Sequence, residues 1–217
     1  MNIRNATPLI LSILLIALIC LLSLYRITHQ NIWINFIANL DIIFASVYLA
    51  WILIESKISK EEINKGNKTS DYGTCELYAI GQAAVFLSAL WFTSAWNYPN
   101  LFHLLGFNLF LAGIAYRLWA IKTLGKYYSH IVREIAGHQI IETGPYRRIR
   151  HPAYAGMILA NLGIIIFFFN WITLILFSLI LIPAIILRII IEEKTLFKMA
   201  KYADYAKNRS RLIPGFW

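Results

Sequence analysis

Charged side chains are scarce in this sequence. Only 14% of its 217 residues are Asp, Glu, Lys or Arg, whereas 59% are hydrophobic, and the mean hydropathy is +0.61. Soluble globular domains carry about 25% charged residues. The composition therefore excludes an ordinary soluble domain and predicts an integral membrane protein.

Cysteine and acidic residues are also few. The two cysteines, Cys20 and Cys75, lie far apart in or beside apolar runs, so neither a disulfide framework nor a zinc site is expected. Eleven acidic residues against twenty Lys and Arg leave a formal net charge of +9. The basic residues lie in the connectors between apolar runs, where orientation in a bilayer explains them better than nucleic-acid binding does.

Long apolar runs fill most of the chain. A helix needs about 20 apolar residues to cross the hydrocarbon layer of a membrane. We expect an all-α, polytopic helical bundle of about six apolar segments, forming one membrane domain over residues 1–217. The last two segments are short and meet at Asn170-Trp171, which leaves two short spans and a hairpin that dips partway as the alternatives. The six runs are 8–24, 32–54, 77–96, 101–121, 152–169 and 171–191.

The basic residues are distributed unequally between the two sides of this predicted bundle. Connectors 55–73 and 122–150 and the tail 192–217 carry four, six and six Lys or Arg, whereas the connectors on the opposite side contain only Arg26. Basic residues accumulate on the cytoplasmic side of a membrane protein. The asymmetry therefore predicts that both termini are cytoplasmic.

Polar residues crowd together immediately before the fifth apolar run. Residues 144–150 combine a Gly-Pro turn with three arginines within four residues, and His151-Pro152 follows. Pro152 suits the first turn of a helix, where its missing N–H costs nothing. His151 and Tyr154 can face the same volume, and Gly156 permits the close approach of backbone or ligand. A helix cap would also explain His151, but the neighbouring arginines favour a ligand pocket.

Arg188 lies inside the last apolar run. An ionised guanidinium there needs an anionic partner, which is either Glu192, one helical turn later, or an anionic ligand. Glu193 is rotated by about 100° from Glu192 around the helix. Two other charges fall within apolar runs. We expect Arg117 to snorkel to the interface, and for Asp41 a helix–helix hydrogen bond is favoured over a functional role.

Several spaced motifs in the second half of the chain occur together. They are Gly144-Pro145-Tyr146, Arg150-His151-Pro152-x-Tyr154-x-Gly156, Arg188 with Glu192-Glu193, Tyr202-x-x-Tyr205, and Arg211-Leu212-Ile213-Pro214. In this combination they resemble the isoprenylcysteine carboxyl methyltransferase (ICMT) family, which belongs with the phospholipid methyltransferases. The segment His138-Gln139-Ile140-Ile141 is similar to the family's His-x-Leu-Val segment. The resemblance covers about residues 100–217.

This resemblance implies an integral membrane methyltransferase that uses S-adenosyl-L-methionine and releases S-adenosyl-L-homocysteine. Residues 1–73 would then hold two spans and a connector, and residues 74–217 the methyltransferase core. The helical C-terminal tail would help to form a cofactor pocket on the cytoplasmic side. The implied reaction is carboxyl O-methylation of an isoprenylcysteine-like substrate that enters from the bilayer.

The resemblance also implies roles for particular residues. Arg188 would hold the acceptor, and Glu192 is the second expected catalytic residue. No metal ligand is expected. The residues implied to bind the cofactor are His138, Gln139, Ile140, Ile141, Tyr146, Arg150, His151, Tyr154, Glu193 and Tyr205.

Three other functions remain open at this point. The acceptor of the methyl group could instead be a phospholipid amine, which would need a proton acceptor such as Glu192, or a small thiol. Membrane sterol reductases share an Arg-His-Pro-x-Tyr segment, which would imply a nicotinamide cofactor. A transporter or scaffold would explain the spans and Asp41, but it would leave the clustered polar residues without a role.

Overall fold

The structure, a computed structural model, describes residues 3–29, 36–62, 71, 73–92, 94–96, 98–132, 139–199 and 201–217. Every long element in these ranges is a helix, and a single backbone bridge joins Ile149 to Ser210. The predicted all-α class is therefore confirmed for the described residues.

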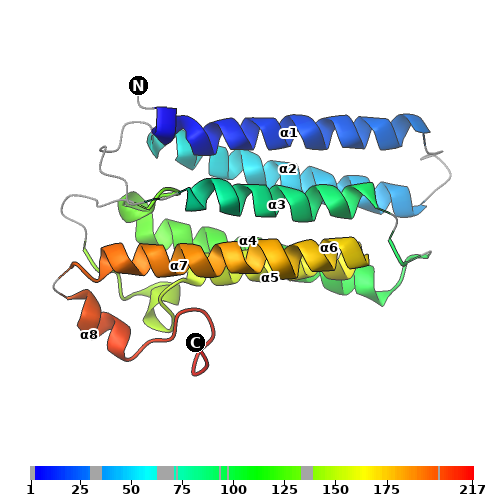
Figure 1. Cartoon of the computed structure of the whole chain (residues 1–217). Coiled ribbons are helices and arrows are strands. Elements are labelled where there is room, and N and C mark those ends of the chain that lie inside the picture. The colour runs from blue at the N-terminus through cyan, green and yellow to red at the C-terminus, as the bar shows by residue number, and fades with distance from the viewer. Residues whose placement is uncertain are drawn as a thin grey trace.

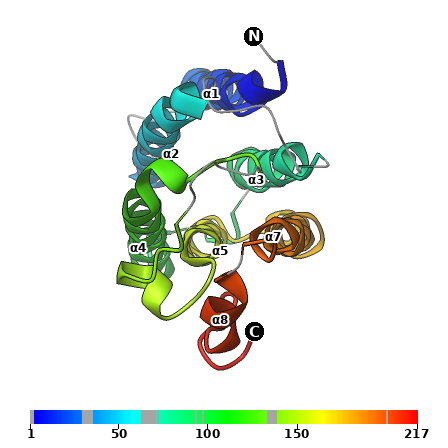
Figure 2. The same cartoon turned by 90° about the vertical axis from the view of Figure 1, so that its left-hand side faces the viewer.

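In this part of the chain, each long helix runs antiparallel to the long helix before it (Figure 1). Figure 2 shows α5 in the middle of the bundle, with α4 on one side and α7 on the other. Short helices η1 (Gly125–Tyr127), η2 (Gly144–Arg147) and α8 (Tyr202–Lys207) follow the bundle helices at one end. The long elements are α1 (Ile3–His29), α2 (Phe36–Glu62), α3 (Thr74–Trp91), α4 (Leu101–Leu124), α5 (Pro152–Phe167), and α6 (Trp171–Leu176), which continues through η3 (Phe177–Leu181) into α7 (Ile182–Leu196).

The last of these helices is continuous, although it contains a proline. Pro183 has no N–H to complete a helical hydrogen bond. Pro183 lies just after η3, a stretch of π-helix. Prolines and π-helical turns are both common places for a long helix to bend without ending. Asn170 begins the helix by accepting the N–H of Thr173 at 2.8 Å. The predicted break at Asn170-Trp171 therefore separates α5 from a long helix and not from a second short arm.

Helices α4 and α5 approach each other closely through glycines on both sides. This is the most extensive helix pairing in the bundle. A Cβ at Gly113 would lie 2.8 Å from the Gly156 carbonyl oxygen, and one at Gly163 would lie 2.6 Å from that of Gly106. Small residues allow membrane helices to pack backbone against backbone. The close approach predicted at Gly156 is thus confirmed, and it fixes the start of α5 against α4.

Aromatic side chains join the first helices to the rest of the bundle. Tyr48 of α2 stacks on Phe86 of α3 with ring centroids 3.6 Å apart, and Phe44 stacks on Phe110 of α4 at 4.3 Å. One buried apolar cluster includes residues from α1 through α7. This shared core is consistent with a single membrane domain, which stays a prediction.

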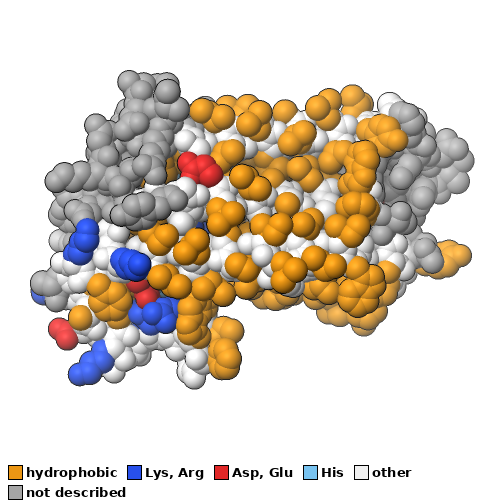
Figure 3. All heavy atoms as spheres, viewed as in Figure 1, with side chains coloured by type: hydrophobic (Ala, Val, Ile, Leu, Met, Phe, Trp, Pro, Cys, Tyr) orange, Lys and Arg blue, Asp and Glu red, His pale blue; other side chains and the backbone are white. Residues whose placement is uncertain are grey.

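The lengths of the helices bear on the number of membrane spans. Within the described residues, three stretches are long and apolar enough to cross a bilayer: Thr7–Tyr25, Leu101–Tyr127 and Trp171–Leu196. Helix α5 is apolar but shorter. Apolar side chains cover the body of the bundle, as Figure 3 shows. The chain is therefore an integral membrane protein by these helices, while the count of six spans stays a prediction.

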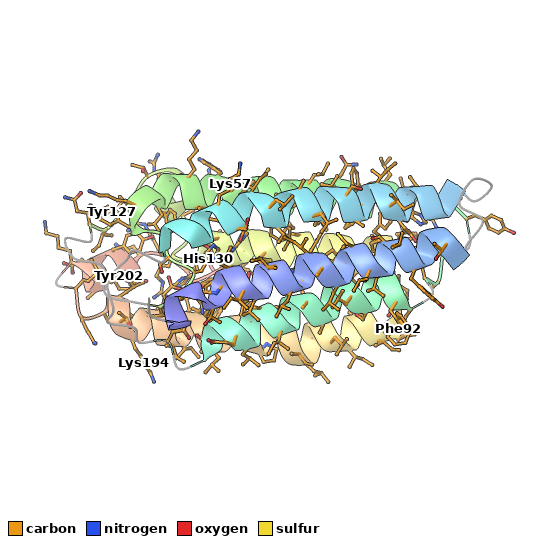
Figure 4. The ribbon with its side chains drawn as sticks, turned by 90° about the horizontal axis from the view of Figure 1, so that it is seen from above. Lys57, Phe92, Tyr127, His130, Lys194 and Tyr202 are labelled. Atoms are coloured by element: carbon orange, nitrogen blue, oxygen red, sulfur yellow. The ribbon has the colours of Figure 1, made fainter. Side chains whose placement is uncertain are left out.

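Polar groups gather at one end of the bundle. Helix α1 begins there and the chain ends there, as Figure 1 shows. Figure 4 shows Lys57, Tyr127, Lys194 and Tyr202 toward this end and Phe92 at the other. We call it the charged end. The predicted cytoplasmic orientation of this end and of the termini is not tested by the fold and stays a prediction.

Candidate active site

A cavity of about 350 Å³ penetrates the bundle at its charged end. Helices α1 to α5, helix α7 and the segment 127–132 all contribute to its lining. We call the polar and aromatic part of its lining the polar branch, and the aliphatic part, much of which comes from α1 and α3, the apolar branch. The polar branch includes Glu55, Tyr78, Arg117, Tyr128, Tyr146, Arg150, His151, Tyr154, Arg188 and Glu192.

Arg188 is buried in the polar branch, where three elements supply its partners. Its Nη1 donates to Asp71 Oδ2 at 3.1 Å and to Thr74 Oγ1 at 3.2 Å. Its Nη2 donates to the carbonyl oxygen of His130, and its Nε donates to the Tyr154 hydroxyl at 2.8 Å. The sequence predicted Glu192 or a ligand as the anionic partner. The structure corrects this, because Asp71 forms the ion pair across a separation of 117 residues.

Tyr154 connects Arg188 to Glu192. Its hydroxyl accepts from Arg188 and donates to Glu192 Oε2 at 2.7 Å. Glu192 lines the cavity. Glu193, the next residue, points to a different face of the helix and is absent from the lining. The chain thus places one phenol between a fixed cation and a carboxylate at the cavity wall.

Glu193 fastens the C-terminal tail to the start of α5. Its Oε1 lies 2.7 Å from Arg150 Nη1 and 3.1 Å from His151 Nε2, and its Oε2 accepts from Arg211 Nε at 2.8 Å. The backbone N–H of Arg150 and that of His151 donate to the Ser210 and Arg211 carbonyls, both at 2.9 Å. These contacts hold His151 at the beginning of α5 and against the cavity.

Arg117 does not snorkel to the interface, and this expectation was wrong. Its side chain is 2% exposed, and it forms a two-pronged ion pair with Glu55 of α2. The Nε–Oε1 distance is 2.5 Å and the Nη2–Oε2 distance 2.8 Å. Arg117 also donates to the Ala153 carbonyl at 3.3 Å and to the Tyr128 hydroxyl at 3.1 Å. A buried partner on α2 removes the need for the guanidinium to reach water.

The second branch of the cavity is apolar and reaches α1. Its walls include Leu11, Leu15 and Ala83. Leu14 of α1 and Ile80 of α3 line the same branch and are 55% and 58% exposed. These two residues therefore place part of the aliphatic lining next to the exposed apolar surface of α1 and α3.

The structure brings about half of the predicted site residues to the cavity. Its lining contains Tyr146, Arg150, His151, Tyr154, Arg188 and Glu192. Gln139, Ile140, Ile141, Glu193 and Tyr205 are not among the lining residues, and His138 lies outside the described residues. Whether any of these residues contacts a cofactor stays a prediction.

The two tyrosines of this set near the C-terminal tail are buried. The Tyr205 hydroxyl donates to the Tyr146 carbonyl at 3.0 Å, which holds α8 against η2. Burial is the largest cause that raises the pKa of Tyr205 to about 12, and burial likewise raises the pKa of Tyr146. Both phenols therefore remain protonated at neutral pH.

Sequence reasoning missed two carboxylates of the site, Glu55 and Asp71. Both were assigned to the solvated connector 55–73. One signal was present at Asp71, because an Asp three residues before Thr74 can cap a helix. Its Oδ1 does accept the Thr74 N–H at 2.8 Å. No sequence pattern, however, links Glu55 to Arg117 or Asp71 to Arg188.

The fold and the cavity together define a class of protein. The chain is a helical integral membrane protein with a cavity at one end, lined by charged and aromatic side chains and by aliphatic ones from α1 and α3. Residues 104–198 match the model of the isoprenylcysteine carboxyl methyltransferase (ICMT) family. The resemblance read from the motifs is thus confirmed over this part of the chain.

Individual relatives match similar stretches. Over 80 residues the chain is 34% identical to uncharacterized protein YpbQ of Bacillus subtilis, covering 37% of this chain and 48% of that protein. Over 109 residues it is 35% identical to protein-S-isoprenylcysteine O-methyltransferase of Saccharomyces cerevisiae, covering 48% and 45%. Over 113 residues it is 28% identical to protein-S-isoprenylcysteine O-methyltransferase B of Arabidopsis thaliana, covering 50% and 57%. The matches span about half the length of these relatives.

Proposed function

We propose that this protein transfers a methyl group from S-adenosyl-L-methionine to the carboxylate of an isoprenylcysteine-like acceptor at the membrane–cytosol interface. The observation that carries the proposal is a cavity whose lining combines charged and aromatic side chains with aliphatic ones, of which Leu14 and Ile80 are also exposed on the apolar outer surface. A water-soluble donor and a lipophilic acceptor can each reach such a cavity from their own phase. Two of the matching relatives are named protein-S-isoprenylcysteine O-methyltransferases, which supports the same reaction.

The residues of the polar branch fit a polar, cationic donor. The Tyr78 hydroxyl and the Arg150 Nε are buried at this branch and have no hydrogen-bond partner among the described residues. Buried polar atoms of this kind call for a ligand or water. The rings of Tyr78, Tyr146 and Tyr154 offer aromatic faces to a cation, and Glu192 offers a carboxylate. Bound there, the cofactor supplies a methyl group on a positively charged sulfur.

The chain's own residues then orient the acceptor. Three of the four bonds that Arg188 donates go to side chains, and the second hydrogen of its Nη2 has no acceptor within the described residues. We assign this hydrogen to the acceptor carboxylate. A grip on the carboxylate by both Nη1 and Nη2 of the guanidinium would require Asp71 to release Nη1.

The remaining residues exclude water and fix geometry. A carboxylate attacks without first losing a proton, so the site needs no general base. Opposite charges neutralise each other as the methyl group moves, and a water-poor chamber that aligns them favours the reaction, chiefly through orientation. The fixed Arg188–Tyr154–Glu192 chain serves this alignment.

One observation favours a second acceptor class. Glu192 lines the cavity and accepts a hydrogen bond of 2.7 Å from the Tyr154 hydroxyl, so its carboxylate could take the proton that a lipid amine releases on methylation. An amine acceptor therefore remains the alternative.

Two experiments on the purified protein in detergent test these functions. Isothermal titration with S-adenosyl-L-homocysteine should release heat at micromolar ligand, whereas NADPH should not. Transfer of label from methyl-labelled S-adenosyl-L-methionine should occur to farnesylcysteine and not to farnesylcysteine amide, in which the carboxylate is blocked. Labelling of phosphatidylethanolamine instead would establish the amine alternative. Heat with NADPH alone would exclude both methyltransferase proposals.

A further inference from the structure

Two buried arginines line the cavity, and the carboxylates that neutralise them both come from the region of the chain before the family match. Arg117 and Arg188 are both 2% exposed and lie inside the stretch that matches the ICMT family. Their carboxylate partners, Glu55 and Asp71, lie before it in the sequence. The family match therefore contains the cations of the chamber but not these counter-ions.

Asp71 is held too firmly to be an incidental partner. Its Oδ1 accepts the Thr74 N–H at 2.8 Å, the Thr74 hydroxyl at 2.7 Å and the Cys75 N–H at 3.2 Å. Its Oδ2 accepts the Val132 N–H at 3.4 Å and Arg188 at 3.1 Å. Burial opposes its ionisation, but Arg188 and the hydrogen bonds outweigh burial and lower the pKa of Asp71. The carboxylate is therefore charged at neutral pH, and it is paired with Arg188 without itself lining the cavity.

Glu55 is fixed in a similar way. Besides both prongs of Arg117, its Oε1 accepts the Trp51 indole N–H at 2.6 Å. Unlike Asp71, Glu55 lines the cavity itself.

The charge of the chamber depends on these two residues. A buried guanidinium without a counter-ion creates a strong positive potential in surroundings of low dielectric constant. The donor proposed above carries a positive sulfur, and its demethylated product does not. We propose that Glu55 and Asp71 are charge-balancing residues that make the chamber receptive to a cationic methyl donor. This inference rests on the proposed function.

The size of the effect follows from Coulomb's law. With an effective dielectric constant of about 20, one unit charge about 10 Å from the sulfonium changes its binding by about tenfold. Removing the charge of Asp71 should therefore weaken S-adenosyl-L-methionine about tenfold relative to S-adenosyl-L-homocysteine, because the two ligands differ by one methyl group and one positive charge. Damage to the shape of the chamber would weaken both ligands alike.

The experiment compares dissociation constants of both ligands for the wild type, Asp71→Asn and Glu55→Gln. Each substitution keeps the size of the side chain and one acceptor oxygen, so the cap of α3 can persist in Asp71→Asn. Glu76→Gln is the matched control, since Glu76 lies in the first turn of α3 and is absent from the cavity lining. A melting curve for each variant verifies that it is folded.

The expected result is a ratio of the two dissociation constants that rises about tenfold in Asp71→Asn and Glu55→Gln and is unchanged in Glu76→Gln. An unchanged ratio in a folded Asp71→Asn or Glu55→Gln protein would overturn the inference while leaving the proposed function intact. If one variant does not fold, the other decides. Wild-type protein that binds neither ligand would refute the proposed function itself, and the inference with it.

Discussion

The close contact between α4 and α5 can be tested by adding a single methyl group. In Gly113→Ala the new Cβ would lie 2.7 Å from Ala160 Cα and 2.8 Å from the Gly156 oxygen, both on the backbone of α5. Ordinary contacts of a Cβ begin at 3.4 Å. Because neither helix backbone can yield locally, the two helices must separate by about 1 Å, and a gap of that size forfeits a quarter to a half of the dispersion energy of each contact across it.

The expected loss of stability is about 3 kcal/mol, at the upper end of the range for overpacked cores. For a chain of about 200 residues this lowers the melting temperature by about 6 to 12 °C. Thermal unfolding in detergent can be followed by the fluorescence of the seven tryptophans. Ala112→Val is the control, because Ala112 is exposed on the same helix and its change should stay within about 0.5 kcal/mol.

The same substitution should also reduce methyl transfer. Arg117 lies one turn after Gly113 and donates to the Ala153 carbonyl of α5 at 3.3 Å, so separation of the helices opens this bond and moves a cavity wall. A Gly113→Ala protein that melts at the wild-type temperature would refute the backbone-to-backbone packing of α4 and α5.

Three further predictions concern the cavity. Arg188→Ala should abolish methyl transfer while changing the affinity for S-adenosyl-L-homocysteine less than about threefold. His151→Ala should weaken that affinity. If titration shows that Arg188→Ala loses the cofactor and His151→Ala keeps it, the roles of acceptor binding and cofactor binding are exchanged between these two residues. Tyr154→Phe removes the hydroxyl between Arg188 and Glu192 and should lower kcat about tenfold or more, the worth of a hydrogen bond to a charged group, in steady-state assays. The pKa of Asp71 is lower in the folded protein than in the unfolded chain. The ionised carboxylate therefore contributes its full stabilisation of the fold above the unfolded-state pKa of about 3.9, and this contribution is lost as the pH falls through the folded-state pKa. Melting temperatures of wild type and Asp71→Asn should therefore converge on acidification, and a constant difference down to pH 2 would contradict this.

Local sequence patterns were reliable where one physical property decides the outcome. Hydrophobic length predicts helices, because an unpaired backbone is not tolerated in lipid. Pro152 was placed correctly in the first turn of α5, since its missing N–H is acceptable only there. The motif containing His151 and Tyr154 also led to residues that line the cavity.

The partners of the buried charges were predicted poorly. Helical spacing favoured Glu192 as the partner of Arg188. Instead, Glu192 accepts a hydrogen bond from Tyr154, and Arg188 forms its ion pair with Asp71. Arg117 was expected to snorkel to the interface, but it is buried in an ion pair with Glu55 of α2. Periodicity within one helix cannot reveal these pairs, because each joins elements that are distant in the sequence.

By itself, then, the sequence determined that this is an α-helical membrane protein and which of its segments carry the charge, and its motifs pointed to six residues that line the cavity. Only the tertiary structure decided that Glu55 and Asp71 neutralise the arginines of the site and that α1 and α3 supply much of the aliphatic lining of the cavity. The physical reason is that hydrophobic length and turn chemistry act over a few residues, whereas the partner of a buried charge is chosen by how whole helices pack.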